Sequence, residues 1–183
     1  MKQLIAILLI IFPTLLFSQS RFSITMNTGA FFPNSSSFKL GVGGLISFDY
    51  HPNNDFTFSL SSGYSTWGYR NTNEYNTRLI PVILGMKYKL AEGNVSPYLS
   101  SEFQYIFGEI DQYIDINPEN GMRLLNPQKE TRNIIDYGIG LGAGVKVPLN
   151  ANFGLDFGSS ILLTAKNSNV YNIRTTVGLS YNF

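Results

Sequence analysis

The sequence has 183 residues, a formal net charge of +1 and 44% hydrophobic residues, but only 14% charged residues, against about 25% in ordinary soluble domains. It contains no Cys and a single His, which excludes disulfide scaffolds, thiol catalysis and cysteine metal sites. Because the charge is nearly balanced and no block of like charges occurs, no nucleic-acid partner is indicated. One domain is expected for this length.

The first twenty residues are typical of a secretory signal peptide. Lys2 supplies a positive start, residues 4–17 are almost wholly apolar, and the small or polar residues 18–20 follow. This apolar stretch is shorter than the roughly 20 residues that a membrane-spanning helix needs. We therefore expect cleavage near residues 18–20, so that residues 1–20 are removed and residues 21–183 form the mature domain outside the cytoplasm. A retained membrane anchor is the alternative.

The rest of the chain shows hydrophobic residues at every second position. This period is typical of β-strands with one apolar face. Eight such segments occur, separated by clusters of Gly, Asn, Pro and Asp. They span residues 22–32, 39–50, 56–67, 79–90, 95–107, 134–147, 153–163 and 171–183.

Charge within these segments follows the same period. In the sixth segment, Ile135 and Tyr137 alternate with Asp136 and Gly138. Across all eight segments the apolar register contains no Asp, Glu, Lys or Arg, and every charged residue falls on the opposite face. These charged residues are Lys39, Asp49, Lys87, Lys89, Glu102, Asp136, Lys146, Asp156 and Arg174.

Alternation alone does not decide which face meets water, because a soluble barrel or sandwich shows the same period with its apolar face inside. The polar face here is mostly Gly, Ser, Thr and Asn, which is a poor solvent surface but a suitable lining for a narrow barrel. Aromatic residues gather near the strand ends on the apolar face, as in the girdles of membrane barrels. These aromatics are Tyr50, Phe56, Tyr88, Phe107, Phe153, Tyr171 and Tyr181.

The connections between the segments alternate in length. Those after the second, fourth and sixth segments are short, whereas the longest, residues 108–133, follows the fifth. Short periplasmic turns and longer external loops give this parity and place both termini in the periplasm. The sequence therefore predicts an all-β fold, an eight-stranded antiparallel up-and-down transmembrane β-barrel. Such a barrel would lie among the lipids of the outer membrane of a Gram-negative bacterium.

The nine inward charges are expected to form ion pairs, because an unpaired ion in a narrow lumen is costly. Two layers of such pairs would plug the barrel. If Val147 lies opposite Phe153 at the short turn between them, Asp156 is one diagonal step from the position that faces Lys146. We therefore predict a Lys146–Asp156 pair. The glycines of the sixth segment are expected to make room for long side chains in the lumen.

Four stretches carry a resemblance to a known family. They are "IPVILGMKYKL" at 80–90, "SPYLSSEFQY" at 96–105, "DYGIGLGAGVKV" at 136–147 and the terminal "VGLSYNF". Together they resemble the small outer-membrane β-barrel family that includes the PorT-like proteins of Bacteroidota, and more distantly the OmpA-type membrane domain. The resemblance implies a role that accompanies protein secretion or assembly.

The last strand carries a second resemblance. Leu179, Tyr181 and Phe183 resemble the C-terminal signal that the outer-membrane insertion machinery reads, and that machinery is an expected partner. An ordinary apolar last strand is the alternative.

No catalytic, cofactor or metal site is predicted. His51 lies beside Pro52 in a predicted turn and is the only His, so a Ser-His-acid triad at the outer rim is excluded. The run "GIGLGAG" lies inside an alternating strand, so the strand-turn-helix context of a phosphate loop fails. The acidic residues of the 108–133 connection match no EF-hand spacing, and a solvated acidic loop is the simpler interpretation.

The 108–133 connection also contains Asn120-Gly121, a strong signal for a two-residue hairpin turn. It predicts an ordered hairpin above the membrane that extends the fifth and sixth strands, either as an edge for a partner or as a protective ornament. The candidate external binding residues are Trp67, Tyr69, Tyr75, Tyr113 and Arg123.

The predicted function is that of a non-enzymatic outer-membrane barrel. We expect a structural, assembly or secretion-associated component whose external loops bind an envelope or secretion protein. A surface adhesion or ligand-binding barrel is the alternative. A soluble periplasmic lipid carrier and a lipid-modifying barrel enzyme are less favoured, and no cofactor is expected.

Overall fold

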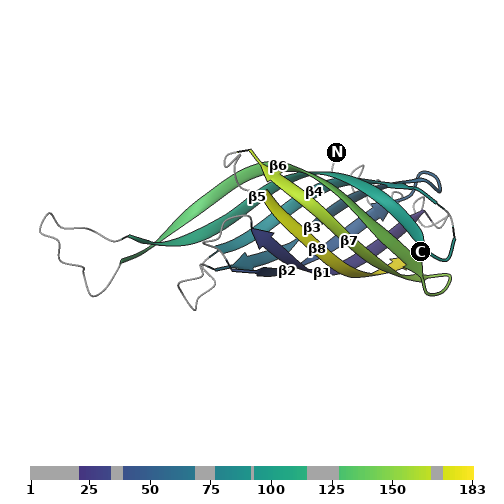
Figure 1. Cartoon of the computed structure of the whole chain (residues 1–183), viewed down its shortest axis with the longest axis horizontal. Helices are drawn as coiled ribbons and strands as arrows, with labels where there is room; N and C mark the ends of the chain where they lie inside the picture. The colour runs from purple at the N-terminus through teal and green to yellow at the C-terminus, as the bar shows by residue number, and fades with distance from the viewer. Residues whose placement is uncertain (1–20, 34–38, 69–76, 92, 115–127, 166–170) are drawn as a thin grey trace, which may run out of the picture.

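The computed structural model describes residues 21–33, 39–68, 77–91, 93–114, 128–165 and 171–183. These residues form one closed barrel in which each strand pairs antiparallel with the next and β8 closes on β1 (Figure 1). The predicted eight-stranded antiparallel barrel is confirmed. The strands are β1 (Phe22–Pro33), β2 (Gly41–Tyr50), β3 (Phe56–Trp67), β4 (Thr77–Lys89), β5 (Ser96–Ile114), β6 (Gln128–Pro148), β7 (Phe153–Thr164) and β8 (Tyr171–Asn182).

The barrel is apolar outside and more polar inside, the reverse of a soluble domain. On β2, Ile46 is 59% exposed, whereas its neighbours Ser47 and Asp49 are 8% and 2% exposed. The same alternation places Leu141 of β6 outside and Asp136 inside. This orientation excludes the soluble lipid carrier, which needs its apolar face inside. Within the described part of the chain, no helix is long and apolar enough to cross a membrane.

The two ends of the barrel differ. The connections 51–55, 90–95 and 149–152 lie at one end, called the turn end below, together with the start of β1 and the end of β8. The opposite end, at which β1, β3, β5 and β7 end, is called the loop end. The predicted signal peptide, residues 1–20, lies outside the described residues.

Aromatic rings form a belt around the outside of the turn end. Phe22 stacks on Tyr50 at 5.1 Å between ring centroids, and Phe153 packs against Tyr181 at 5.1 Å. Phe56 and Tyr88 form a further pair, at 5.0 Å. Rings at this level suit the interface between hydrocarbon and headgroups.

β5 and β6 are much longer than the other strands. They have 19 and 21 residues, compared with 10 to 13 in the rest. β4 begins opposite Ile110 of β5, and β7 ends opposite Gly138 of β6. Beyond both positions, residues 111–114 pair with 128–131, and these residues, together with Arg132, project from the loop end (Figure 1). We call this part the projecting hairpin.

The apolar alternation ended the fifth strand at residue 107 and began the sixth at residue 134, whereas the Asn120-Gly121 signal predicted a hairpin that extends both strands. The structure shows both strands extended, to residue 114 and from residue 128, and Asn120-Gly121 itself lies outside the described residues. The alternation stops short because it marks only the part of a strand that faces lipid. Beyond it, outward positions such as Glu109 become polar while the backbone pairing continues.

Candidate functional site

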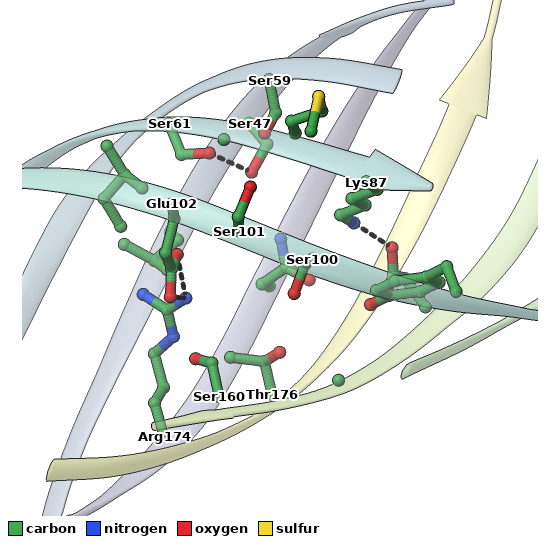
Figure 2. A pocket seen from close by; sticks show the side chains of 18 of the residues that line it. Ser47, Ser59, Ser61, Lys87, Ser100, Ser101, Glu102, Ser160, Arg174 and Thr176 are labelled. Carbon is green, nitrogen blue, oxygen red and sulfur yellow. Dashed lines mark hydrogen bonds and ion pairs between the residues drawn. The ribbon is translucent and has the colours of Figure 1, made fainter. Parts of the chain in front are cut away.

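The centre of the lumen is closed by an ion pair between strands that are not neighbours. Arg174 of β8 donates from Nη2 to both carboxylate oxygens of Glu102 on β5, at 2.8 and 2.6 Å (Figure 2). Both side chains are buried, with 11% and 9% exposure. Charge-assisted bonds of this kind are among the stronger ones in proteins. A Cβ at Gly140 of β6 would collide with the Glu102 side chain, so this glycine makes room for the pair.

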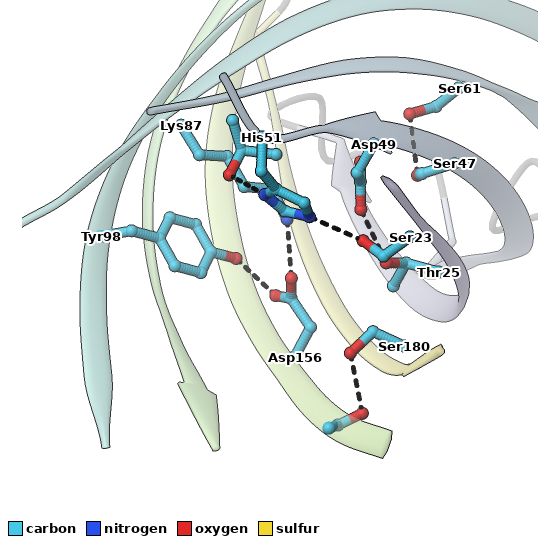
Figure 3. A network of polar contacts seen from close by, with 12 residues as sticks. Ser23, Thr25, Ser47, Asp49, His51, Ser61, Lys87, Tyr98, Asp156 and Ser180 are labelled. Atoms are coloured by element: carbon cyan, nitrogen blue, oxygen red, sulfur yellow. Dashed lines mark hydrogen bonds and ion pairs between the residues drawn. The ribbon is translucent and has the colours of Figure 1, made fainter. Parts of the chain in front are cut away.

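A second polar network lies nearer the turn end. Lys87 of β4 forms a 2.6 Å ion pair with Asp156 of β7, and the Tyr98 hydroxyl donates to the other oxygen of Asp156 (Figure 3). The Lys87 ammonium also lies 4.8 Å from the centre of the Tyr98 ring. A Cβ at Gly144 would meet this ring, so a second glycine of β6 has the same spacing role.

The structure pairs Asp156 with Lys87, not with Lys146 as the sequence interpretation proposed. The register places Lys146 directly opposite Asp156, whereas the prediction placed it opposite Gly154. The turn explains the shift, because the Asn150 side chain accepts hydrogen bonds from the backbone N–H groups of Asn152 and Phe153. These bonds shorten the turn and bring Leu149, rather than Val147, opposite Phe153.

The other predicted lumen charges are placed as follows. Lys39 precedes β2, and Lys89 lines a cavity of about 290 Å³ at the turn end together with Lys146. Asp49 accepts a 2.8 Å hydrogen bond from Thr25. Asp136, at the loop end, accepts a 2.8 Å bond from the backbone N–H of Tyr137.

His51 lies at the turn end, just after β2. Its Nε2 lies 2.9 Å from the Ser23 hydroxyl and its Nδ1 lies 2.9 Å from the Thr57 hydroxyl (Figure 3). Burial, reinforced by the positive charge of Lys146, lowers the pKa of His51 from 6.5 to about 4. The imidazole is therefore neutral at ordinary pH and acts as a hydrogen-bond bridge between β1 and β3.

The lumen also contains buried apolar side chains, which the sequence interpretation missed. Phe31, Leu79, Ile83 and Leu162 point inward and are each at most 8% exposed. A narrow eight-stranded barrel has to be filled by side chains, and here aliphatic and aromatic groups fill the space that ion pairs leave. A face judged polar from its glycines and serines thus contains an apolar layer.

The predicted external binding residues do not form one cluster among the described residues. Trp67 is the last residue of β3, and it lines the lumen and contacts the Phe31 ring at 6.4 Å. It therefore is not part of an external aromatic surface as the sequence suggested. Tyr113 lies on the projecting hairpin, opposite Lys129. Tyr69, Tyr75 and Arg123 lie outside the described residues.

A polar cluster joins the base of the projecting hairpin to β4. Arg78 lies 3.5 Å from Glu109 and 3.4 Å from Asp111. The Thr131 hydroxyl donates to Asp111 at 2.8 Å, and Asp111 is only 3% exposed. These four residues, the hairpin-base cluster, hold β4, β5 and β6 together where the barrel ends. Arg78 was not predicted as a site residue, because it precedes the apolar alternation.

The described residues contain no group of three or more His, Asp or Glu side chains arranged to hold a metal ion.

Residues 4–183 match the model of the outer membrane protein beta-barrel domain family. The chain belongs to this family. No curated protein is similar enough in sequence to count as a relative.

Solved outer-membrane proteins share the fold. Neisserial surface protein A is 18% identical with a TM-score of 0.65, over 88% of this chain and 97% of that one. Ail, the attachment invasion locus protein of Yersinia pestis, is 18% identical with a TM-score of 0.57, over 89% and 98%. OprG from Pseudomonas aeruginosa is 11% identical with a TM-score of 0.58, over 88% and 95%.

Membership of this family places the barrel in the outer membrane of a Gram-negative bacterium, where its apolar outer face contacts lipid. The hairpin-base cluster then marks where lipid contact ends at the loop end, because charged residues on a barrel's lipid face are costly at the bilayer centre and much less so at its edge. Arg78 is 49% exposed on this outer face. The projecting hairpin accordingly stands outside the hydrocarbon region.

Proposed function

We propose that this outer-membrane barrel is a non-enzymatic, non-conducting anchor that presents its projecting hairpin to a protein partner outside the cell. The observation that carries the proposal is the excess length of β5 and β6 over their neighbours. About 30 Å of β6 extends beyond the end of β7, at roughly 3.3 Å per residue. A strand pair that leaves the barrel without a covering neighbour suits partner binding by strand addition.

The orientation of the barrel in the membrane is part of the proposal. The short connections and both chain ends lie at the turn end, as expected for the periplasmic side of such barrels. A cleaved signal peptide at residues 1–20 fits this orientation. The loop end, with the projecting hairpin, then faces the exterior.

The interior supports anchoring rather than transport or catalysis. The Arg174–Glu102 pair and the buried apolar side chains occupy the lumen, which favours a closed interior. Ser23 and His51 are hydrogen bonded, but Ser23 is 0% exposed, and the group on the other side of His51 is the Thr57 hydroxyl rather than a carboxylate. A nucleophile without access to substrate performs no hydrolysis.

The partner is a protein of the envelope or of a secretion system, as the PorT-like resemblance implies. Adhesion is the second candidate, since Ail is named for attachment and has been solved with the heparin analogue sucrose octasulfate. The projecting hairpin, however, mixes Asp111 and Glu130 with Lys129 and Arg132. Mixed charge favours a protein surface over a polyanion.

Site-specific photocrosslinking in native cells tests the proposal. A photoreactive residue replaces Arg132, which is exposed on the projecting hairpin, or Leu141, which is 67% exposed on the lipid face and serves as the matched control. We expect one discrete protein adduct from position 132 and none from position 141. A variant in which residues 113–129 are replaced by an Asn-Gly turn should lose the function of the native protein in cells and still fold as a barrel. Lipid-only adducts at position 132 would contradict the proposal.

A further inference from the structure

The loop-end half of the lumen contains a cavity that neither ion pair fills. Its volume is about 120 Å³, and a smaller cavity of about 30 Å³ lies deeper, beside Arg174. Strands from all around the barrel line both spaces. The residues common to both are Trp67, Leu79, Ile106, Thr164 and Asn172.

Three buried polar atoms on the walls of these two cavities have no hydrogen-bond partner among the described residues. They are Thr77 Oγ1 of β4, Gln104 Nε2 of β5 and Asn172 Oδ1 of β8. Thr77 lines the larger cavity, Gln104 lines the smaller one, and Asn172 lines both. Buried polar groups in proteins are almost always satisfied, so Thr77 and Asn172 on the wall of the larger cavity point to a molecule that supplies the missing partners.

We propose that this cavity binds a small, uncharged ring compound that carries a hydroxyl group, with phenol as the simplest example. The size fits, because an engineered apolar cavity of roughly 150 Å³ binds benzene. The walls fit as well, since Trp67, Leu79 and Ile106 offer a flat or apolar surface to a ring. A hydroxyl both donates and accepts, so it can donate to Asn172 Oδ1 and accept from the Thr77 hydroxyl.

The cavity excludes anionic ligands and long acyl chains. Arg174 is already neutralised by Glu102, and Asp136 places a carboxylate on the wall. An anionic ligand would therefore lose its hydration without gaining a new counter-ion. An acyl chain of a membrane lipid is too long for the space.

The cavity lies toward the loop end. Pro33, Trp67 and Thr77 stand at strand ends on that side, whereas the Arg174–Glu102 pair closes the lumen below. The ligand therefore enters and leaves through the same mouth and does not cross the membrane. The evidence for this site does not come from the projecting hairpin, so failure of this proposal would not affect the proposed anchoring function.

Trp67 reports on the site directly, because it lines the cavity and is the only Trp in the chain. The mature barrel, folded in lipid nanodiscs, is titrated with phenol, toluene or benzoate while Trp67 fluorescence is recorded, and calorimetry gives an independent affinity. We expect saturable binding of phenol, binding of toluene that is about fivefold weaker because it lacks the hydroxyl, and none of benzoate.

Four variants distinguish binding in the cavity from partitioning into the surrounding lipid. Ile106→Phe fills the cavity and should abolish the saturable signal, with Leu79→Phe as a second filling variant. Thr77→Val removes one hydroxyl and should weaken phenol binding about fivefold without changing toluene binding. Ser61→Ala removes a lumen hydroxyl that bonds Ser47 outside the cavity and should change neither.

Folding of each variant is checked by its heat-dependent migration in gels. A saturable phenol signal that Ile106→Phe or Leu79→Phe removes supports the site. The proposal is overturned if phenol gives only the unsaturable signal of lipid partitioning, which means that the cavity holds water alone. Equal binding of benzoate, or phenol binding that is indifferent to Thr77→Val, would overturn it too.

Discussion

Lys87 and Asp156 lie 69 positions apart in the sequence and meet across the lumen in a 2.6 Å ion pair. Their strands, β4 and β7, are not neighbours in the barrel. The pair therefore joins opposite walls, as the Arg174–Glu102 pair does between β8 and β5. Two cross-lumen pairs at different heights hold the wall of the barrel together from inside.

Breaking the lower cross-lumen pair should destabilise the barrel. Lys87→Met leaves the buried Asp156 carboxylate without its counter-ion, and loss of one partner of a buried pair typically costs about 3 kcal/mol or more. Because Lys87 is 25% exposed, we expect a loss at the lower end of that range. The double variant with Asp156→Asn should cost less than the sum of the two single changes.

The free energy of unfolding in lipid vesicles, measured by urea titration, gives these values. Lys146→Met is the matched control, because Lys146 lies opposite Asp156 in the register and has no ion-pair partner among the described residues. A larger loss for Lys146→Met than for Lys87→Met would contradict the assignment of the pair.

Charge on the lipid face should impair folding into bilayers. Val82→Arg and Leu141→Arg place a cation at mid-strand positions that are 37% and 67% exposed on the outer face, and such changes cost about 2 to 4 kcal/mol near the bilayer midplane. Gly85→Ala adds a methyl group inside, where it meets only the Ser59 hydroxyl closely. Urea unfolding of the three variants in vesicles should therefore leave Gly85→Ala the most stable, and equal values would refute the assignment of faces.

The alternation of side chains was sufficient to predict strand number, pairing order and outer face, because lipid contact imposes apolar residues such as Leu141 at every second position. Turn chemistry was harder to predict. Asn150 shifts the register at one turn through two side-chain hydrogen bonds, and this shift moved the predicted partner of Lys146. Local patterns also do not show which distant strands face each other. The Lys87–Asp156 and Arg174–Glu102 pairs could therefore be identified only from the structure of the closed barrel.

The apolar layer in the lumen has a different cause. Phe31 and Leu79 follow the same two-residue period as the inward Thr25 and Ile83, but this period does not show which inward positions fill gaps left by strands across the barrel. Trp67 was placed outside because its position at a strand end resembles an interfacial aromatic. The cavity it lines was therefore not predictable from spacing.

The barrel should not conduct ions. Eight strands leave an interior just wide enough for side chains, and Arg174 and Glu102 occupy its centre with less than 12% exposure. Planar-bilayer recordings of the purified monomer should show no stable open state. The double variant Glu102→Gly with Arg174→Gly removes this plug and should show small, brief openings. Reproducible ohmic conductance of the unaltered monomer would contradict the plugged interior.

The C-terminal aromatic residues should affect assembly in cells more than intrinsic stability. Tyr181 and Phe183 contact each other at 5.2 Å on the outside of the turn end, where the insertion machinery would reach them. Phe183→Ala should lower the amount of folded barrel in the outer membrane several-fold, while unassisted folding into vesicles changes little. Leu141→Ala, another outward substitution, is the control. Equal losses in cells for both variants would indicate an ordinary apolar strand.

Acid should destabilise the barrel through His51. In the folded state its pKa is lowered to about 4 by burial and by the Lys146 charge, whereas the unfolded chain has an ordinary pKa of about 6.5. Between these values the unfolded chain binds a proton that the folded barrel does not, so stability falls as the pH drops through this window. The full shift corresponds to roughly 3 kcal/mol, and partial exposure reduces the expected loss to about 2 kcal/mol.

His51→Gln keeps a side chain that bonds Ser23 and Thr57 but does not titrate, so it isolates the contribution of the imidazole. Urea unfolding at pH 7.5 and pH 4.5 should show a larger loss for the natural barrel than for this variant, by about 2 kcal/mol. The carboxylates titrate in both proteins and cancel in the difference. Because the chain has one His, the imidazole resonances of the folded barrel give its pKa directly. An imidazole that titrates near 6.5 in the folded barrel, or equal losses in the two proteins, would show that the Ser23–His51–Thr57 bridge does not hold the ring neutral.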